Sequence, residues 1–262
     1  MADDNSKPNN ALKAKGYCES RKNVTFIPLN ESKGAGRARN AGLDRASGQW
    51  LIFADSDDFF DEGFWTFVDS VVDADGGNDI YYFKVRGVDS DTLEPVKRGT
   101  NYNSYVKNLL AGKRHAEDRI RFFNMVPWSK VYKHSFIKAN NIRFEEVMAS
   151  NDVMFATYAG AKAGKIAAYD KVMYVVTSRS GSLVKQTSSE VLRCRFDVYL
   201  RQNQYLNSIG KSMYIIDLIK PMKKAMKYYG IAELGWYFKR IKETGVNPLA
   251  SVKKKFNFLK FL

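Results

Sequence analysis

The sequence predicts an α/β protein with a mostly parallel sheet flanked by helices, followed by a helical, basic C-terminal region. Short apolar runs alternate with helix-like segments through the first hundred or so residues, which is the order that parallel sheets require. With 262 residues and 45% hydrophobic content, the chain can bury one large core, or a core and a smaller appendage. From about Ser188 the pattern becomes mostly helical.

The expected elements come in three blocks. In the first, to about Arg98, Asp61 is the expected N-cap of a helix. This block predicts strands at Val24–Leu29, Trp50–Ala54 and Ile80–Val85, and helices at Gly36–Ala46 and Glu62–Val72. The second, roughly Asn101–Gln186, mixes helices with short strands such as Ala167–Thr177. We therefore predict one domain over residues 1–187 and a helical region over 188–262.

Composition narrows the class of protein. Two cysteines, Cys18 and Cys194, are too few for a disulfide framework. The N-terminus is acidic and polar where a secretory signal would be basic and then apolar, and no run reaches membrane-spanning length. We expect a cytoplasmic protein. The net charge is +14, and from Gly210 to Leu262 twelve basic residues face three acidic ones, so most of the excess lies in the tail.

Three aspartates follow the predicted Trp50–Ala54 strand. In open parallel sheets, the carboxyl ends of the strands form the edge where ligands bind. Asp55 and Asp57, spaced Asp-x-Asp, suit a hard divalent cation that also takes oxygens of a substrate diphosphate. The alternative is that they fill a turn and cap the next helix, because Asp is favoured in both places. Spacing and position leave both interpretations open.

The segment just upstream predicts an anion site. Asn30–Gly48 places glycines, Lys33, Arg37 and Arg39 at the start of a helix, where free N–H groups and the helix dipole favour an anion. Arg39 stands where a dinucleotide fingerprint requires its third glycine, and no G-K-[ST] follows to form a Walker loop. Neither familiar nucleotide motif is therefore complete.

These residues resemble a known family. The run KGAGRARNAGLDRASGQWLIFADSDD resembles the core signature of family 2 glycosyltransferases of the GT-A fold. The start, ADDNSKPNN, resembles the family's Asp-Asp-x-Ser turn, which reads the nucleotide base. The later MVPWSKVYKHSFIKANNIRFEEVMASNDVMF resembles its acceptor half, with Asn-Asp where the family usually has Glu-Asp. The likeness covers about residues 3–186, with 1–100 as the nucleotide-sugar half and 101–187 as the acceptor half.

The resemblance implies a role for each matching residue. Asp4 would contact the base, commonly uracil, and Asp152 would be the general base. Asp55 and Asp57 would hold Mn²⁺ or Mg²⁺, and Trp128 and Lys130 would line the acceptor side. The residues that the resemblance implies bind the nucleotide sugar are Asp4, Lys33, Gly36, Arg39, Asn40 and Asp55.

Asp152 also has a purely structural interpretation. The residues SNDVMF can begin a helix, with Ser150 or Asn151 as the N-cap and Asp152 complementing the helix dipole. The family pattern favours the catalytic interpretation instead. Glu145 and Glu146 are the other candidate bases.

The implied function is inverting, metal-dependent transfer of a sugar from a nucleotide diphosphate, UDP above all, to a glycan or lipid-linked glycan in surface polysaccharide biosynthesis. Members of the family begin with a strand and helix that precede the Asp-Asp turn, so we hypothesise a truncated product or a misplaced start. Cooperative melting together with turnover would refute this. An inactive remnant that binds nucleotide or a membrane surface, and a basic RNA-binding protein, are the rival interpretations.

The tail interleaves lysines with aromatic and aliphatic residues, as in IIDLIKPMKKAMKYYG. Such helices either pack their apolar sides and leave a solvated basic face, or anchor the protein at anionic lipid. Nucleic acid is the other partner that a basic protein suggests, but no RRM, zinc-finger or helix-turn-helix signature supports it.

Overall fold

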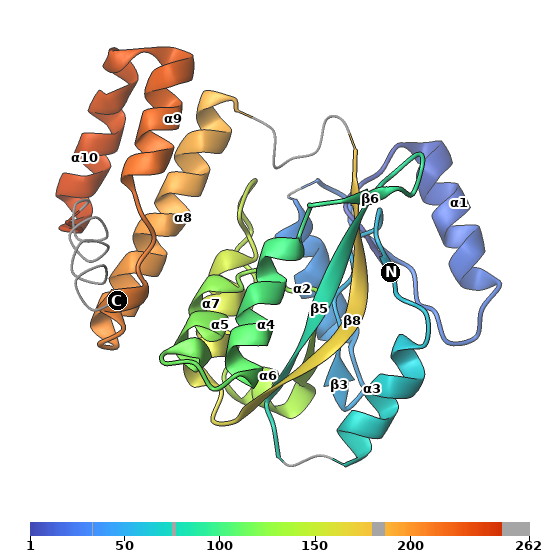
Figure 1. Ribbon diagram of the computed structural model, residues 1–262. Coiled ribbons are helices and arrows are strands. Elements are labelled where there is room, and N and C mark those ends of the chain that lie inside the picture. The colour runs from blue at the N-terminus through green and yellow to red at the C-terminus, as the bar shows by residue number, and fades with distance from the viewer. Residues whose placement is uncertain (33, 75–76, 180–186, 248–262) are drawn as a thin grey trace.

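The computed structural model describes residues 1–32, 34–74, 77–179 and 187–247. It confirms the α/β class: a curled mixed sheet is flanked by helices, and further helices stand at one side (Figure 1). The N-terminal part contains β1 (Ala2–Asp3), α1 (Pro8–Glu19), β2 (Ile27–Pro28), α2 (Ala35–Arg45), β3 (Trp50–Leu51), β4 (Phe59–Phe60), α3 (Phe64–Asp73), β5 (Ile80–Asp89) and β6 (Pro95–Val96).

The remaining elements complete the sheet and add the C-terminal helices. The middle part contains η1 (Thr100–Tyr102), α4 (Asn103–Leu110), α5 (Ala116–Phe123), β7 (Lys130–Lys133), α6 (His134–Ala139), α7 (Val153–Lys162) and β8 (Ile166–Ser178). The C-terminal region contains α8 (Ser189–Ser208), η3 (Ser212–Tyr214), α9 (Ile219–Tyr229), η4 (Ile231–Glu233) and α10 (Leu234–Thr244).

The main sheet has the strand order β3-β7-β5-β8-β4, with β6 paired to β5. β5 and β8 run parallel, whereas the β3–β7, β5–β7 and β4–β8 pairs are antiparallel. β1 and β2 form a separate parallel pair. The sheet is thus mixed where the sequence predicted mostly parallel strands. An apolar run indicates a strand but says nothing of its direction.

Several predicted boundaries change. The expected Val24–Leu29 and Trp50–Ala54 strands shorten to β2 and β3, because only those residues pair with a neighbouring strand. The expected cap Asp61 is wrong: Gly63, in a left-handed conformation with φ 68°, directly precedes α3. The Asp61 carboxylate instead accepts a hydrogen bond from Arg86 Nε at 2.7 Å.

Side chains of β5 pack into the hydrophobic core on both faces of the sheet. Side chains alternate along a strand, so Ile80 and Tyr82 pack in one cluster with residues of α4–α7, while Tyr81 and Phe83 pack in another with α3. Figure 1 shows α4, α5 and α7 on one side of β5 and β8, with α3 on the other. A sheet covered on both faces explains why the Ile80–Phe83 run is continuously hydrophobic.

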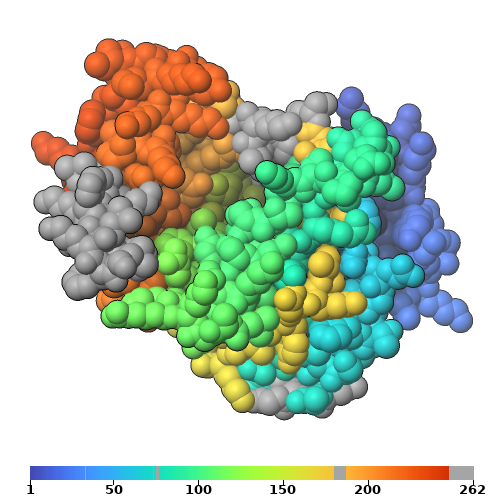
Figure 2. All heavy atoms as spheres, in the orientation of Figure 1, coloured from blue at the N-terminus to red at the C-terminus, as the bar shows by residue number. Residues whose placement is uncertain are grey.

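The C-terminal helices have an apolar core of their own. Leu192, Phe196, Met222 and Tyr237 lie buried between α8, α9 and α10, as the helical pattern predicted. α8 also joins the first part of the protein, because Gln202 Nε2 donates to Thr157 Oγ1 on α7 at 3.0 Å. Figure 2 shows these helices (orange) beside the green middle segments, at the opposite side of the molecule from α1 (blue).

Candidate active site

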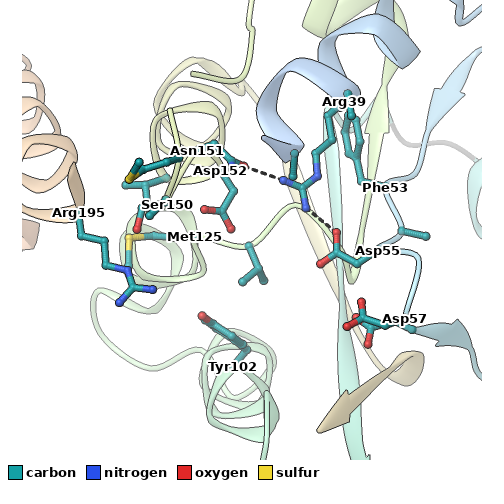
Figure 3. A pocket seen from close by; sticks show the side chains of 18 of the residues that line it. Arg39, Phe53, Asp55, Asp57, Tyr102, Met125, Ser150, Asn151, Asp152 and Arg195 are labelled. Atoms are coloured by element: carbon teal, nitrogen blue, oxygen red, sulfur yellow. Dashed lines mark hydrogen bonds and ion pairs between the residues drawn. The ribbon is translucent and has the colours of Figure 1, made fainter. Parts of the chain in front are cut away.

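One large cleft gathers half of the predicted site residues: Asp4, Arg39, Asp55, Asp57 and Asp152. It has a volume of about 2120 Å³ and lies among the turn after β1, helix α2, the aspartates after β3, the start of α7 and the C-terminal helices. Figure 3 shows its central part, with Arg39, Asp55 and Asp57 at one end, Arg195 at the other and Asp152 between them.

The aspartates after β3 sit on a turn that β8 fixes in place. Asp55 N donates to Tyr174 Oη at 2.7 Å, and Thr177 Oγ1 donates to the backbone oxygen of Asp57, also at 2.7 Å. Asp58 accepts from Thr177 N at 2.8 Å. Burial raises the pKa of the Asp58 carboxyl, against the lowering effect of that bond, and its neighbours Asp57 and Asp55 raise it further. Asp55 and Asp57 line the cleft together (Figure 3).

Arg39 connects both sides of the cleft. From α2 its guanidinium donates to Asp55 Oδ1 at 2.5 Å and to Asn151 Oδ1 at 2.7 Å (Figure 3). Its guanidinium carbon also lies 5.4 Å from the centre of the Phe144 ring. Because a planar guanidinium donates in a fixed fork, it fixes the distance between the aspartate turn and the start of α7.

Asp4 organises the loop that leads into α2. Its Oδ2 accepts hydrogen bonds from Ser32 Oγ and Gly34 N, both at 2.9 Å. These bonds hold the loop that leads into α2, and Gly34 enters the helix with φ 87°, a value that favours glycine. Asp4 also lines the cleft, at the end where the aspartates lie.

Asp152 lines the cleft directly before α7. Asp152 itself, rather than the expected Ser150 or Asn151, is the N-cap residue of α7, and its side chain accepts no capping hydrogen bond within the described part of the chain. Burial raises the pKa of the Asp152 carboxyl, while the positive charge of Arg39 opposes the rise. The other candidate bases are engaged outside the cleft: Glu145 pairs with Arg201 at 2.8 Å, and Glu146 accepts from Asn40 at 3.3 Å.

The carboxylates suit a divalent cation that is shared with a substrate. No group of three or more His, Cys, Asp or Glu side chains close enough to hold a metal occurs among the described residues. Mg²⁺ typically uses only one or two protein carboxylates and completes its shell with phosphate oxygens and water. Asp55 and Asp57 meet that requirement. Each also lies beside a guanidinium group: Asp55 pairs with Arg39, and Asp57 lies 3.3 Å from Arg179.

Two predicted nucleotide-sugar residues prove to be packing residues. A Cβ on Gly36 would lie 2.1 Å from the backbone oxygen of Glu145, so only glycine allows this approach. Asn40 is buried, donates to the Phe144 oxygen at 3.0 Å and accepts from Phe144 N at 2.9 Å. Neither lines the cleft; both fix α2, and so Arg39, against residues 144–145. Lys33, predicted beside them, lies outside the described residues.

The two predicted acceptor-side residues lie in the core. Trp128 is only 8% exposed, and its ring stacks on Tyr174 with centres 5.5 Å apart. Lys130 is 1% exposed and donates to the backbone oxygens of Asn124 and Val126 at 2.6 and 2.8 Å. Burial lowers the Lys130 pKa to about 7. Neither side chain lines the cleft, because Trp128, just before β7, and Lys130, its first residue, are both buried in the interior.

Comparison with known proteins establishes the family. The model of the family described as "Glycosyl transferase family 2" matches residues 1–137, just over half of the chain. The chain belongs to glycosyl transferase family 2. Among curated family proteins, the poly(ribitol-phosphate) beta-N-acetylglucosaminyltransferase TarS of Staphylococcus aureus is 28% identical over 152 residues, covering 57% of this chain and 25% of TarS. The cholesterol galactosyltransferase of Borreliella burgdorferi is 26% identical over 175 residues, covering 63% of this chain and 48% of that protein.

Solved structures agree on the GT-A fold. Crystal structures of S. aureus TarS match with a TM-score of 0.61 at 19% identity, covering 88% of this chain and 38% of that chain. TarS 1–349 in complex with UDP-GlcNAc matches with a TM-score of 0.57 at 19% identity, covering 90% of this chain and 81% of that one. This family 2 chain therefore spans half or less of the length of the curated relatives it matches.

Sequence reasoning missed three residues of this family 2 cleft. Asn151 accepts from Arg39, and the departure from the family's usual Glu-Asp was the available signal. Tyr102, from η1, and Arg195, from α8, both line the cleft. Nothing in the local pattern around Tyr102 or Arg195 distinguishes either from an ordinary helical residue. Burial raises the Tyr102 pKa to about 12, and the negative charge of Asp152 adds to this effect.

Proposed function

We propose that this protein transfers a sugar from a nucleoside diphosphate, UDP in particular, to a hydroxyl of a glycan or lipid-linked glycan in surface polysaccharide biosynthesis, with inversion at the anomeric carbon. One observation carries the proposal. A carboxylate with a raised pKa, Asp152, faces the same cleft as the Asp55–Asp57 turn, and Arg39 links the two through Asn151 and Asp55.

The donor binds at the aspartate end in this proposal. Asp4 recognises the base and Asp55 the ribose or metal, while Arg39 lies beside the diphosphate. Asp55 and Asp57 hold Mn²⁺ or Mg²⁺, which, when bound, offsets the negative charge that develops on the departing diphosphate. The TarS complexes with UDP-GlcNAc and UDP support this class of donor.

Asp152 acts as the general base. A base must lie within hydrogen-bond reach of the attacking hydroxyl and must be deprotonated at the working pH. The raised pKa makes the Asp152 carboxylate a stronger proton acceptor than an exposed aspartate, and Arg39 keeps the charged form accessible. Attack on the side of the anomeric carbon opposite the leaving diphosphate, in a single displacement, inverts its configuration.

A nucleotide-sugar assay tests the proposal. We expect UDP release from one member of a UDP-sugar panel in the presence of Mn²⁺ or Mg²⁺, and its loss with chelator or in Asp57→Asn. Asp91→Asn, which changes an exposed carboxylate outside the cleft, is the matched control. UDP binding without turnover would instead support an inactive remnant that binds nucleotide, and absence of both with binding to vesicles would support a membrane-surface remnant. Tight RNA binding would support the RNA-binding interpretation.

We further propose peripheral contact with an anionic membrane at the cytoplasmic face. No helix in the described residues has the length and apolar character needed to cross a bilayer. α9 and α10 expose Met226, Tyr228 and Phe238 at 41%, 52% and 56%, next to lysines such as Lys227. Aromatic and basic side chains together suit the headgroup region.

Vesicle sedimentation tests the membrane contact. We expect the protein to bind phosphatidylserine-containing vesicles more tightly than neutral vesicles. On phosphatidylserine-containing vesicles, Lys227→Gln/Phe238→Ser should bind more weakly than the unaltered protein. Equal binding of the variant and the unaltered protein, or binding of RNA but not of vesicles, would contradict this part of the proposal.

A further inference from the structure

Charge is unequally distributed along the cleft. Asp3, Asp4, Asp55, Asp57 and Asp58 lie at the end formed by the turns after β1 and β3. Two arginines at that end, Arg39 and Arg179, face Asp55 and Asp57. The wall contributed by α5, α8 and α9 instead carries Arg119, Arg195, Lys220 and Lys224. This wall, named here the cationic wall, holds several positive charges and lies away from the aspartate turn.

Arg195 places one of these charges next to the reaction centre. Figure 3 shows it opposite Arg39, with Asp152 and Tyr102 between the two arginines. Two other arginines of α8 lie outside the cleft: Arg193 pairs with Glu233 at 2.8 Å, and Arg201 pairs with Glu145 at 2.8 Å. Of these α8 arginines, Arg195 is the one that lines the cleft.

Lys220 and Lys224 add two more charges one helical turn apart. Residues at i and i+4 of a helix are neighbours, and like charges at that spacing destabilise the helix. Both lysines belong to α9 and line the cleft, with Lys220 exposed and Lys224 half-buried. Asp217 is the acid nearest to them in sequence, and its Oδ1 accepts from Ile219 N at 2.9 Å. An anion bound between the lysines would offset their repulsion.

An anion bound at the cationic wall would be distinct from the diphosphate of the sugar donor. The donor already has its own charge complement at the aspartate end, where Arg39 and a cation-binding carboxylate pair lie. Asp152 lies between that end and Arg195 of the cationic wall (Figure 3). A ligand that presents a hydroxyl to Asp152 from the helical side therefore brings any charged group against Arg195, Lys220 and Lys224.

We propose that the acceptor of this protein carries a phosphate group, and that Arg195, Lys220 and Lys224 bind this phosphate while the acceptor hydroxyl faces Asp152. The inference rests on the proposed function for the identity of the acceptor site. Arginine binds phosphate oxygens in a bidentate manner, and lysines contribute compact point charges, so the set suits a phosphate better than a single carboxylate.

Two sources of such a phosphate differ in chemistry. A polyol phosphodiester places phosphate along the polymer, whereas a lipid-linked acceptor places a diphosphate beside its first sugar. Glycerol 3-phosphate and farnesyl diphosphate are the respective probes, with glycerol and glucuronate as neutral and carboxylate controls. Calorimetric titrations are run on the full chain with saturating UDP and Mg²⁺, which keeps the probes out of the donor end.

Variants locate the binding. We expect one or both phosphate probes to bind, with affinity falling at least about ten-fold in Arg195→Gln, equivalent to about 1.4 kcal/mol, and at least as much in Lys220→Gln/Lys224→Gln, because each change removes charged contacts to the phosphate. Lys223→Gln is the matched control, since Lys223 lies on α9 and does not line the cleft. It should bind the probes as the unaltered protein does. UDP affinity and the thermal midpoint, measured on each variant, identify any change caused by misfolding.

The outcomes separate this inference from the proposed function. The inference fails if neither phosphate probe binds, if glucuronate binds as tightly, or if the three cleft substitutions and Lys223→Gln have equal effects. UDP binding without probe binding overturns the phosphate-bearing acceptor alone. Probe binding that depends on Arg195 in a protein that does not bind UDP overturns the proposed function and leaves an anion site.

Discussion

The two ends of the cleft are built in different ways. At the aspartate end, the ligand-facing carboxylates sit on a backbone turn that strand β8 holds through Tyr174 and Thr177. At the helical end, the charges are carried by long side chains on α8 and α9. Through α8, those helices pack against α5 and α7 in two buried apolar clusters, and they make polar contacts such as Gln202 with Thr157 and Arg201 with Glu145.

In the proposed function, the strand-held aspartate end serves the sugar-transfer step, and the helical end serves recognition of the acceptor. Groups held by strands and backbone hydrogen bonds are preorganised, and developing charge on a leaving group requires such preorganisation. Side chains on added helices can change without disturbing the sheet. A protein built in this way can keep one donor chemistry while its helices determine the acceptor. Asp152 stands at the boundary, on the turn before α7, and Arg39 ties that turn to the aspartate end.

The largest expected effect comes from Asp152→Asn, which keeps the shape of the boundary and removes the base. Transfer should fall by about 10²–10⁴-fold, while UDP affinity is retained. In the unaltered protein, kcat/KM should rise as the pH increases through the raised pKa of Asp152, because only the deprotonated carboxylate accepts a proton. A pH–rate profile of both proteins measures this. A variant that keeps both the rate and the acid limb would exclude Asp152 as the base.

Arg39→Lys tests the link between the ends and should have the next largest effect. A lysine cannot donate to Asp55 and Asn151 in the same fork, so donor kcat/KM should fall about ten-fold or more. Initial rates against UDP-sugar concentration measure this. Arg37→Lys, which retains charge at a position on α2 outside the cleft, is the control. Equal rates for both variants would show that the two-sided contact of Arg39 is not required.

Gly36→Ala tests how α2 is positioned, through stability. The new Cβ would lie 2.1 Å from the Glu145 oxygen, so the helix or its neighbour must shift, at a cost of about 1–3 kcal/mol in the free energy of unfolding. Gly42→Ala in the same helix meets nothing within 4 Å and should stabilise by up to about 1 kcal/mol. Urea unfolding of both proteins gives the comparison. Similar stability changes in the two variants would contradict this tight approach.

Tyr174→Phe should have the smallest effect, and that effect should be confined to the aspartate end of the cleft. The substitution removes the acceptor of the Asp55 N–H bond, worth about 1 kcal/mol, while it keeps the ring packed on Trp128. The affinity for Mn²⁺ plus UDP should weaken slightly, and binding of glycerol 3-phosphate should not change. Titrations of both ligands measure this. A larger change at the helical end would mean that the two ends are not separate.

Local motifs predicted the aspartate end well. The Asp-x-Asp spacing, the apolar run before it and the arginine-bearing helix are contiguous in sequence, and the structure brings Arg39 and Asp55 into contact. The same reasoning failed for Trp128 and Lys130, which are buried. A residue's place in a motif does not say whether its side chain is buried, because that depends on the distant segments that cover both faces of β7: Tyr132 packs in one core cluster and Val131 in the other.

By itself, the sequence determined the α/β class, the helical C-terminal region and the order of the carboxylates and arginines, since periodicity and short motifs act over a few neighbouring residues. Only the tertiary structure decided that Arg39 reaches Asn151, 112 positions away, that Gly36 and Asn40 serve packing, and that Arg195 faces the cleft. Such contacts arise from the packing of distant segments, which fills space with all side chains at once and leaves no local signature.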